Sequence, residues 1–505
     1  MGRIKHVFQF LSGEKTEGSG RPPYFLSFRS SSALIVITVN LAIFTDIFFY
    51  GLIVPVLPFA LPAQVGIAQD QVQTWVSVLL AVYSAALFIG SPLAGIYADH
   101  TSSRRWPLIL GLLALAGATF LLAFGNSVGL YILGRLLQGV SAAVVWSVGC
   151  ALLVDTMGSS VGVAMGYVNI SMSIALLLAP VVGGVVYNNA GYLAVYYVAF
   201  AVVGVDIVLR LIMIEKKVAA QWIHEPSASE SETPSQGADK EALANSSDAQ
   251  LPRDSCDRSG RQTAADTRGG GGQEDARQTD QNKHRGRRIM VLLRSPRLLA
   301  AMYGIVVESG ILMGFDAVLA LFVKQLFGWN STAVAVLLLA LFIPGLTAPL
   351  AGWLSDKYGA KWPSFAGFLA TVPILICLRF VTENTTQHKV LLAFLLALAG
   401  FTLPFSMTPL MAEITYVIDA EEAKTPGVFG KNGAYGLGYG LFNMAFALGG
   451  IIGPIWAGYV VASAGWGTLG WSFGIWSASA AAVVCIWGAS KPKASMPGDT
   501  VVEKS

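Results

Sequence analysis

Twelve apolar segments, each long enough to cross a lipid bilayer as a helix, constrain this chain more than any other feature. About 20 residues rising 1.5 Å each span the hydrocarbon core, and lipid admits only helices and closed barrels. The chain is 54% hydrophobic and 12% charged, whereas a typical soluble domain is about 25% charged. We therefore predict an all-α, multi-pass integral membrane protein. The segments are 33–62, 73–98, 107–125, 128–153, 162–186, 192–214, 298–323, 333–354, 363–381, 388–413, 430–460 and 467–489.

A long polar stretch divides these segments into two sets of six. Residues 215–297 are rich in Ser, Asp, Glu, Gln and Arg and contain a glycine run, a composition that cannot bury a core. We predict an N-terminal six-helix bundle at 33–214, a disordered cytoplasmic linker at 215–297 and a C-terminal bundle at 298–489. Residues 1–32 and 490–505 are predicted to be cytoplasmic tails.

Lysine and arginine gather on one side of the predicted spans. The connections on the other side contain only Lys324, so the positive-inside rule places both termini and the linker in the cytoplasm. We predict the plasma membrane as the location, with a vacuolar or vesicular membrane as alternatives. The sequons at Asn330 and Asn384 fall on the outer side and are predicted glycosylation sites.

Two short patterns occur once in each half, at matching places. Gly95-Ile-Tyr-Ala-Asp99, after the second span, corresponds to Gly352-Trp-Leu-Ser-Asp356 after the eighth. In the fifth span, Ala179-Pro180-Val-Val-Gly183-Gly184 corresponds to Gly453-Pro454-Ile-Trp-Ala457-Gly458 in the eleventh. Two matched pairs at matched positions indicate a duplicated six-helix unit.

These motifs resemble those of the major facilitator superfamily, and within it the twelve-helix drug:proton antiporter group. The fourth span matches the R-x-x-Q-G motif at Arg135, Gln138 and Gly139. The resemblance implies two pseudo-symmetric six-helix bundles, a monomer, and transport driven by a proton gradient without a cofactor. The loop signature G-x-L-A-D-R-x-G-R-R is matched at Gly95, Ala98, Asp99, Arg104 and Arg105, and the antiporter signature G-x-x-x-G-P-x-x-G-G at Pro180, Gly183 and Gly184.

The first span has a weaker resemblance to vesicular amine transporters. Asp46 is followed by Val54-Pro55-Val-Leu-Pro58, and in those transporters the equivalent aspartate pairs with the ammonium of the substrate. Asn443 stands where that group usually carries a second acid. A carboxylate at this depth costs roughly 2.5–3.5 kcal/mol on insertion scales, so it faces a bundle interior or a wet cavity. The alternative is an aspartate that bonds a neighbouring helix.

Five charged residues lie inside predicted spans, away from the helix ends. The family fold places the first, fourth, seventh and tenth spans around a central cavity, so these residues are candidates for substrate and proton binding. Burial disfavours the charged form of an acid, so such a residue can bind and release a proton. Arg135 favours the ionised form of a neighbouring acid or bonds backbone carbonyls. The five are Asp46, Arg135, Glu308, Asp316 and Glu413.

Aromatic side chains in the same spans are candidates to line a hydrophobic cavity. They offer cation–π contacts to an amine, although each has lipid contact or helix packing as the alternative. These residues are Phe49, Tyr50, Trp146, Phe315, Tyr435 and Phe442.

The loop motifs are candidates for a gate. The resemblance implies that they hold the outward-open state at the inner side, and the alternative is a turn that only sets topology. The gating candidates are Gly95, Asp99, Arg104, Arg105, Gly352 and Asp356. The antiporter motif residues, Pro180, Gly183, Gly184, Gly453 and Pro454, are expected to pack their helix against a partner in the other half.

The leading hypothesis is proton-coupled antiport, for efflux or sequestration, of a small amphipathic organic compound, with an organic cation as one candidate. The alternatives are a facilitator or symporter for a small nutrient, or a transporter-like membrane sensor. An enzyme is not predicted, because the sequence contains no catalytic triad, no metal-ligand cluster and no phosphate-binding loop. The predicted partners are the substrate, protons and the lipid bilayer, and the small net charge of +3 suggests no nucleic acid.

Overall fold

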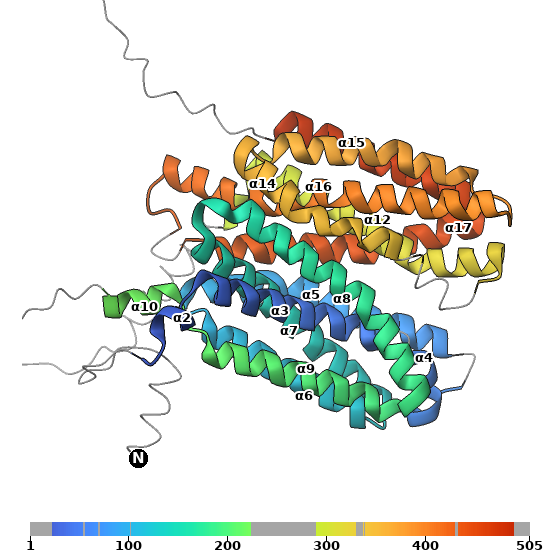
Figure 1. The fold of residues 1–505 in the computed structure, drawn as a ribbon, viewed down its shortest axis with the longest axis horizontal. Coiled ribbons are helices and arrows are strands. Elements are labelled where there is room, and N and C mark those ends of the chain that lie inside the picture. The colour runs from blue at the N-terminus through green and yellow to red at the C-terminus, as the bar shows by residue number, and fades with distance from the viewer. Residues whose placement is uncertain are drawn as a thin grey trace, which may run out of the picture.

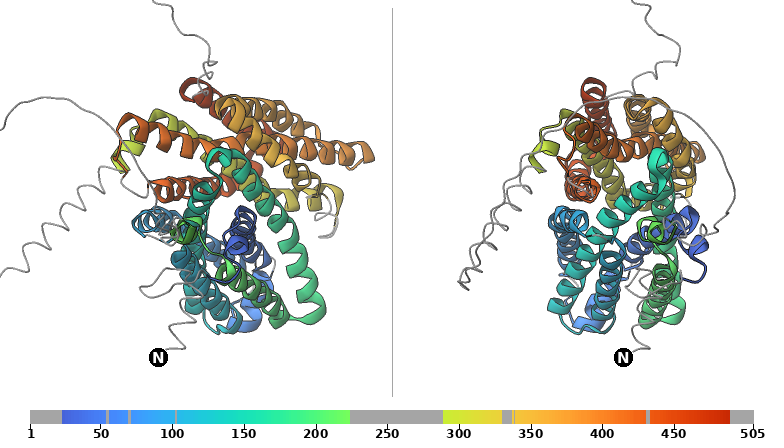
Figure 2. Two further views of the ribbon diagram at one scale, coloured as in Figure 1. Left: turned by 60° about the vertical axis from the view of Figure 1, so that its left-hand side comes forward. Right: turned by 90° about the vertical axis from the view of Figure 1, so that its left-hand side faces the viewer.

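Helices account for the transmembrane body of the protein. The computed structural model describes residues 23–53, 56–68, 71–101, 103–223, 289–329, 337, 339–429 and 433–488. Two helical bundles lie side by side, the N-terminal one coloured blue to green and the C-terminal one yellow to red (Figures 1 and 2).

The N-terminal bundle contains six long helices, as predicted. They are α3 (Ser32–Ile53), α5 (Val72–His100), α6 (Arg105–Phe124), α7 (Val128–Met157), α8 (Val161–Ala190) and α9 (Tyr192–Ile212). Shorter elements flank them: α2 (Leu26–Arg29), α4 (Leu57–Ala60), η1 (Leu61–Val65), η2 (Gly158–Ser160) and α10 (Lys216–Ile223).

The C-terminal bundle contains α12 (Pro296–Phe327), η3 (Pro344–Thr347), α14 (Ala348–Tyr358), α15 (Lys361–Cys377), η4 (Leu378–Phe380), α16 (Thr386–Lys424) and α17 (Tyr435–Trp487). The backbone of α17 leaves helical geometry at Gly465, whose φ of 82° suits glycine. This break divides α17 into the last two predicted spans. Within the described residues, eleven helical stretches are long and apolar enough to cross a membrane, counting α17 once. The all-α membrane fold is therefore confirmed.

Two boundaries differ from the expectation. The first predicted span, 33–62, contains three described elements, α3, α4 and η1, and residues 54 and 55 lie outside the described residues. Prolines within this stretch lack the N–H that a continuous helix needs. The predicted linker also begins with a helix, α10. Residues 224–288 of the linker lie outside the described residues.

The ends of the bundle are distinguished by the connections they carry. We call the end with residues 100–101, 103–105, 213–216, 358–361, 425–429 and 433–434 the linker end. There α10 is anchored, since Glu215 accepts hydrogen bonds from the backbone N–H of Arg105 at 2.7 Å and the Ser103 hydroxyl at 2.8 Å. The Lys217 ammonium lies 3.2 Å from Asp155 in α7.

The Gly-Pro segments pack within each half, so the expected partner in the other half was wrong. A Cβ on Gly183 in α8 would meet the backbone of Leu52 in α3. In the C-terminal half, a Cβ on Gly453 in α17 would meet the backbone of Gly310 in α12. Small residues allow this close approach between neighbouring helices of one bundle. Pro180 and Pro454 both lie inside their helices, and Gly184 faces open space.

Candidate functional site

A cavity surrounds Asp46 where the two halves meet. Asp46 in α3 is fully buried, and aromatic rings of α3, α5, α7 and α17 contribute to the wall around it. The lining residues are Asp46, Ile47, Tyr50, Tyr83, Ser84, Leu87, Trp146, Met172, Leu176, Met313, Asn443, Phe446, Ala447 and Gly450. The cavity is thus an apolar, aromatic chamber with one acidic side chain.

The Asp46 carboxylate is only partly satisfied. Its Oδ2 accepts a hydrogen bond from the indole N–H of Trp146 at 3.1 Å. Its Oδ1 is buried and has no hydrogen-bond partner among the described residues. No lysine or arginine of the described residues forms an ion pair with it. A cationic ligand would therefore find an acceptor that the protein leaves uncompensated.

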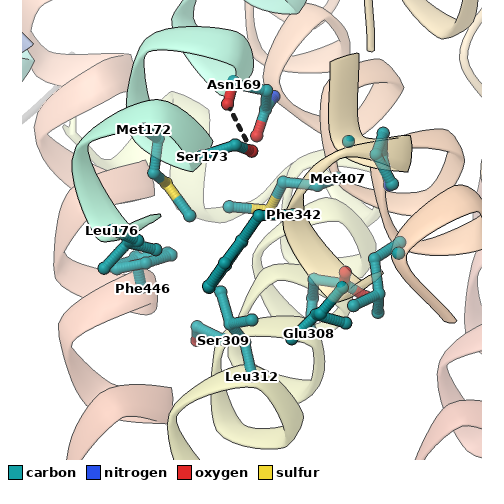
Figure 3. Close-up of a pocket in the computed structure, with 15 residues that line it drawn as sticks. Asn169, Met172, Ser173, Leu176, Glu308, Ser309, Leu312, Phe342, Met407 and Phe446 are labelled. Atoms are coloured by element: carbon teal, nitrogen blue, oxygen red, sulfur yellow. Dashed lines mark hydrogen bonds between the residues drawn. The ribbon is translucent and has the colours of Figure 1, made fainter. Parts of the chain in front are cut away.

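A second cavity surrounds Glu308 on the C-terminal side. Glu308 in α12 is 4% exposed, and its Oε2 accepts a hydrogen bond from the Ser406 hydroxyl at 2.8 Å. Figure 3 shows this carboxylate below Phe342 and Met407, with the Ser173–Asn169 hydrogen bond on the opposite wall. The lining residues are Asn169, Met172, Ser173, Leu176, Glu308, Ser309, Leu312, Leu341, Phe342, Gly345, Gly400, Leu403, Pro404, Met407 and Phe446.

The two cavities share part of their walls. Met172 and Leu176 of α8 and Phe446 of α17 line both. Each half thus supplies one buried carboxyl group, Asp46 or Glu308, to one of two adjoining cavities. Met side chains are unbranched and adaptable, so this shared wall can change shape around a ligand.

The other two candidate acids lie outside these cavities. Glu413 in α16 pairs with Arg297 at the start of α12, with 2.8 Å between Nη2 and Oε1. That ion pair belongs to the linker end. Asp316 does not line either cavity, but it lies one turn beyond Met313 on α12 and acts electrostatically on Tyr50, which lines the Asp46 cavity.

Arg135 is fully buried in α7. Its Nη1 donates to the Gln138 side-chain oxygen at 2.9 Å, and its guanidinium lies 5.9 Å from the centre of the Tyr50 ring. Neither expected role, an acid neighbour or a backbone carbonyl partner, is present among the described residues.

The first loop motif joins the two halves at the linker end. Asp99, at the end of α5, accepts hydrogen bonds from the backbone N–H groups of Gly436 and Leu437, both at 2.8 Å. These two groups open α17, where orphan N–H groups and the helix dipole favour a carboxylate. Asp99 therefore caps a helix of the other half.

The second copy of the motif makes the reciprocal contact. Asp356 in α14 accepts hydrogen bonds from the backbone N–H groups of Gly162 at 2.8 Å and Val163 at 3.0 Å, at the start of α8. The Tyr416 hydroxyl donates to the same carboxylate at 2.7 Å. The internal repeat thus produces two interlocking caps, one from each half.

Glycines allow these caps to form. A Cβ on Gly95 would meet the backbone of Gly436, and a Cβ on Gly352 would meet the backbone of Gly162. Gly95 and Gly352 lie one turn before the capping aspartate of their own helix, and the glycines that they meet, Gly436 and Gly162, donate to that aspartate. The four gating positions Gly95, Asp99, Gly352 and Asp356 therefore all lie at the interface between the halves.

The two arginines of the motif have different environments. The Nε of Arg104 lies 2.7 Å from Asp155, and its Nη1 lies 3.7 Å from Asp99. Arg105 donates instead to the backbone carbonyls of Arg210 and Leu211 at the end of α9. Arg104 thus belongs to the cap, whereas Arg105 holds the N-terminal half together.

Several site residues were not predicted from the sequence. Tyr83, Ser84 and Asn169 line the cavities. Asp155 forms an ion pair with Arg104 beside the Asp99 cap. They carry no motif, and only the helix packing brings them to the site. Of the aromatic candidates, Tyr50 and Trp146 line the Asp46 cavity, whereas Tyr435 bonds Asp419 at the linker end.

One glycosylation candidate, Asn384, lies at the opposite end. Asn384 is exposed in the connection before α16, and Asn330 lies outside the described residues. Among the residues that the structure places, no group of three or more His, Cys, Asp and Glu side chains could hold a metal ion.

Comparison with known proteins places the chain in a family. The sequence model of the Major Facilitator Superfamily matches residues 39–430 and 345–501. An uncharacterised MFS-type transporter of Schizosaccharomyces pombe is 33% identical over 434 residues, covering 86% of this chain and 90% of its own length. The class B tetracycline resistance protein of Escherichia coli is 27% identical over 380 residues, covering 74% and 79% respectively.

A solved structure has the same fold. The human organic anion transporter MFSD10 superposes with a TM-score of 0.59 at 15% identity, over 90% of this chain and 99% of its own. The motifs, the paired bundles and the family match agree, and the resemblance drawn from the sequence is confirmed. The chain belongs to the Major Facilitator Superfamily and is a multi-pass membrane transporter.

Proposed function

We propose that this transporter exchanges protons for a small amphipathic organic cation by alternating access. The observation that carries the proposal is the Asp46 carboxylate, which is buried in an aromatic cavity with one oxygen unpartnered among the described residues. An organic cation would gain an ionic contact with Asp46 and cation–π contacts with Tyr50, Tyr83 or Trp146. The similarity to a tetracycline resistance protein supports a small organic substrate.

Exchange follows from the chemistry of a buried carboxyl group. In an apolar cavity the neutral form of such a group is favoured until a cation arrives. Binding of the cation at Asp46 favours the carboxylate and so releases a proton. Glu308, in the adjoining cavity, offers a second carboxyl group that is placed to take part in proton coupling.

Alternating access requires that the contacts closing one end of the cavity break when that end opens. The caps made by Asp99 and Asp356 hold the halves together on the linker side of both cavities, which supports a state closed at that end. We assign the linker end to the cytoplasm, as the charge distribution of the sequence predicts, and we further propose a monomer in the plasma membrane.

The test is proton movement in liposomes containing the purified protein under an imposed pH gradient. We expect an organic cation to drive proton flux in the wild type and not in Asp46→Asn. Glu383→Gln, an exposed acid at the opposite end, is the matched control and should behave as wild type. Flux with the same coupling in Asp46→Asn would remove Asp46 from the mechanism. Uptake without proton movement would indicate a facilitator, and binding without uptake a sensor.

A further inference from the structure

Arg135 differs from the other buried arginines of the described residues. Arg210 forms a bidentate pair with Asp206, and Arg104 pairs with Asp155. Arg29 and Arg105 donate to backbone carbonyls at the end of α9. Arg135 has neither kind of partner, although its side chain is fully buried.

Three donor nitrogen atoms are left without an acceptor at this one place. They are Nε and Nη2 of Arg135 and the side-chain nitrogen of Gln138, which is itself 1% exposed. The two side chains are joined by a 2.9 Å hydrogen bond, so their donors are held close together. Buried donors of native proteins are normally satisfied, and a buried charge normally has a counter-charge.

The groups around the guanidinium do not supply that charge. The titratable side chains that act on it electrostatically are the hydroxyls of Tyr50, Tyr83 and Tyr196. The rings of Tyr50 and Tyr83 pack at a tilt of 37° with their centres 4.9 Å apart, and both line the Asp46 cavity. The tyrosine pair therefore lies close both to Arg135 and to the Asp46 cavity.

We propose that Arg135 and Gln138 form a binding site for a monovalent anion that accepts several hydrogen bonds. The anion has one of two sources: a free ion such as chloride, or an acidic group on the transported molecule. Arg135 precedes Trp146, the partner of Asp46, by eleven residues on α7, roughly 16 Å along the helix axis. A transported molecule that reached both charges would be an elongated zwitterion.

Thermal unfolding of the purified full-length protein tests the free-ion source without any organic compound. Sodium chloride and sodium gluconate are compared at equal ionic strength. Chloride should raise the melting temperature of the wild type and of Lys324→Gln, an exposed control on α12. Arg135→Gln should lose this difference. Gln138→Glu should also lose it while staying folded, because the new carboxylate occupies the site, so the test does not depend on Arg135→Gln folding.

Binding of octylamine and 8-aminooctanoic acid tests the second source, since the two differ by one carboxylate. A substrate carboxylate at Arg135 predicts tighter binding of the amino acid, by about tenfold or more, lost in Arg135→Gln. Asp46→Asn should abolish the proposed transport but keep the rise in melting temperature with chloride. The two proposals can therefore fail independently. A melting temperature indifferent to chloride, together with equal binding of both compounds, would mean that only water meets Arg135 and would overturn the proposal.

Discussion

The Asp99 carboxylate lies 2.8 Å from the backbone nitrogen of Gly436, so α5 of one half caps the first turn of α17 in the other. A carboxylate bonded to backbone N–H groups contributes roughly 1.5–3 kcal/mol per bond, and the helix dipole adds about 0.3–1 kcal/mol. These bonds exist only while the halves meet at the linker end. They therefore bias the equilibrium between two conformations.

Asp99→Ala is expected to favour the state open at the linker end by about tenfold or more, because it removes two such bonds. The readout is labelling of Ser84→Cys, in the cavity wall, by a membrane-impermeant thiol reagent from the linker side, in a background whose native cysteines are serine. Glu421→Ala, at the same end, is the control. Equal labelling rates in Asp99→Ala and the control would show that the cap is not a gate.

Asp356→Ala should act in the same direction, since it removes the reciprocal cap on α8. The two caps lie on different helices, so the double variant should show nearly the sum of the two free-energy shifts. The same labelling assay measures all three variants. A double variant no more open than either single one would mean that the two caps break together as one unit, so that losing either has the full effect.

Glycine substitutions should separate the two kinds of close helix packing. Gly95→Ala meets the backbone of the other half and should open the linker end with little loss of stability. Gly453→Ala meets the backbone of Gly310 within its own half and should lower the melting temperature instead. Gly184→Ala, in open space, is the control. Thermal unfolding and cysteine labelling together distinguish the outcomes, and a reversed pattern would contradict the assignment of these interfaces.

Asp206→Asn is expected to destabilise the N-terminal half by about 3–5 kcal/mol, because it leaves the fully buried Arg210 without its counter-charge. Unfolding of the purified protein measures this loss. Replacing both residues with apolar ones, as Asp206→Leu with Arg210→Met, should recover most of it. No recovery would indicate that the packing at this site, rather than the charge, matters.

Glu308→Gln should greatly reduce substrate-driven proton movement, whereas Glu413→Gln should largely retain it. The reason is position: Glu308 lines a cavity, and Glu413 pairs with Arg297 at the linker end. Proton flux in liposomes measures both. Loss of flux in a stable Glu413→Gln, with normal flux in Glu308→Gln, would reverse the roles proposed for the two acids.

Much of the fold was predictable because hydrocarbon allows so few structures. The long apolar segments indicated helices, and the paired motifs indicated two related halves, since each motif depends on residues close in the chain. Not every helix boundary was predictable. The break at Gly465 falls between the predicted spans 430–460 and 467–489, whereas the separate elements α4 and η1 inside the first span were not predicted, because hydropathy shows that apolar stretch as one continuous segment.

The sequence by itself determined that this chain is a duplicated helical membrane protein and that acids such as Asp46 and Glu308 lie inside membrane-spanning helices. Only the tertiary structure decided what those residues meet. Packing puts Asp46 beside Trp146, a hundred residues away, and gives Glu413 an arginine partner instead of a cavity. Packing also puts the Gly-Pro segments in contact with helices of their own half. The physical reason is that hydropathy and motifs are local properties, whereas the partner of a buried charge depends on how distant helices pack.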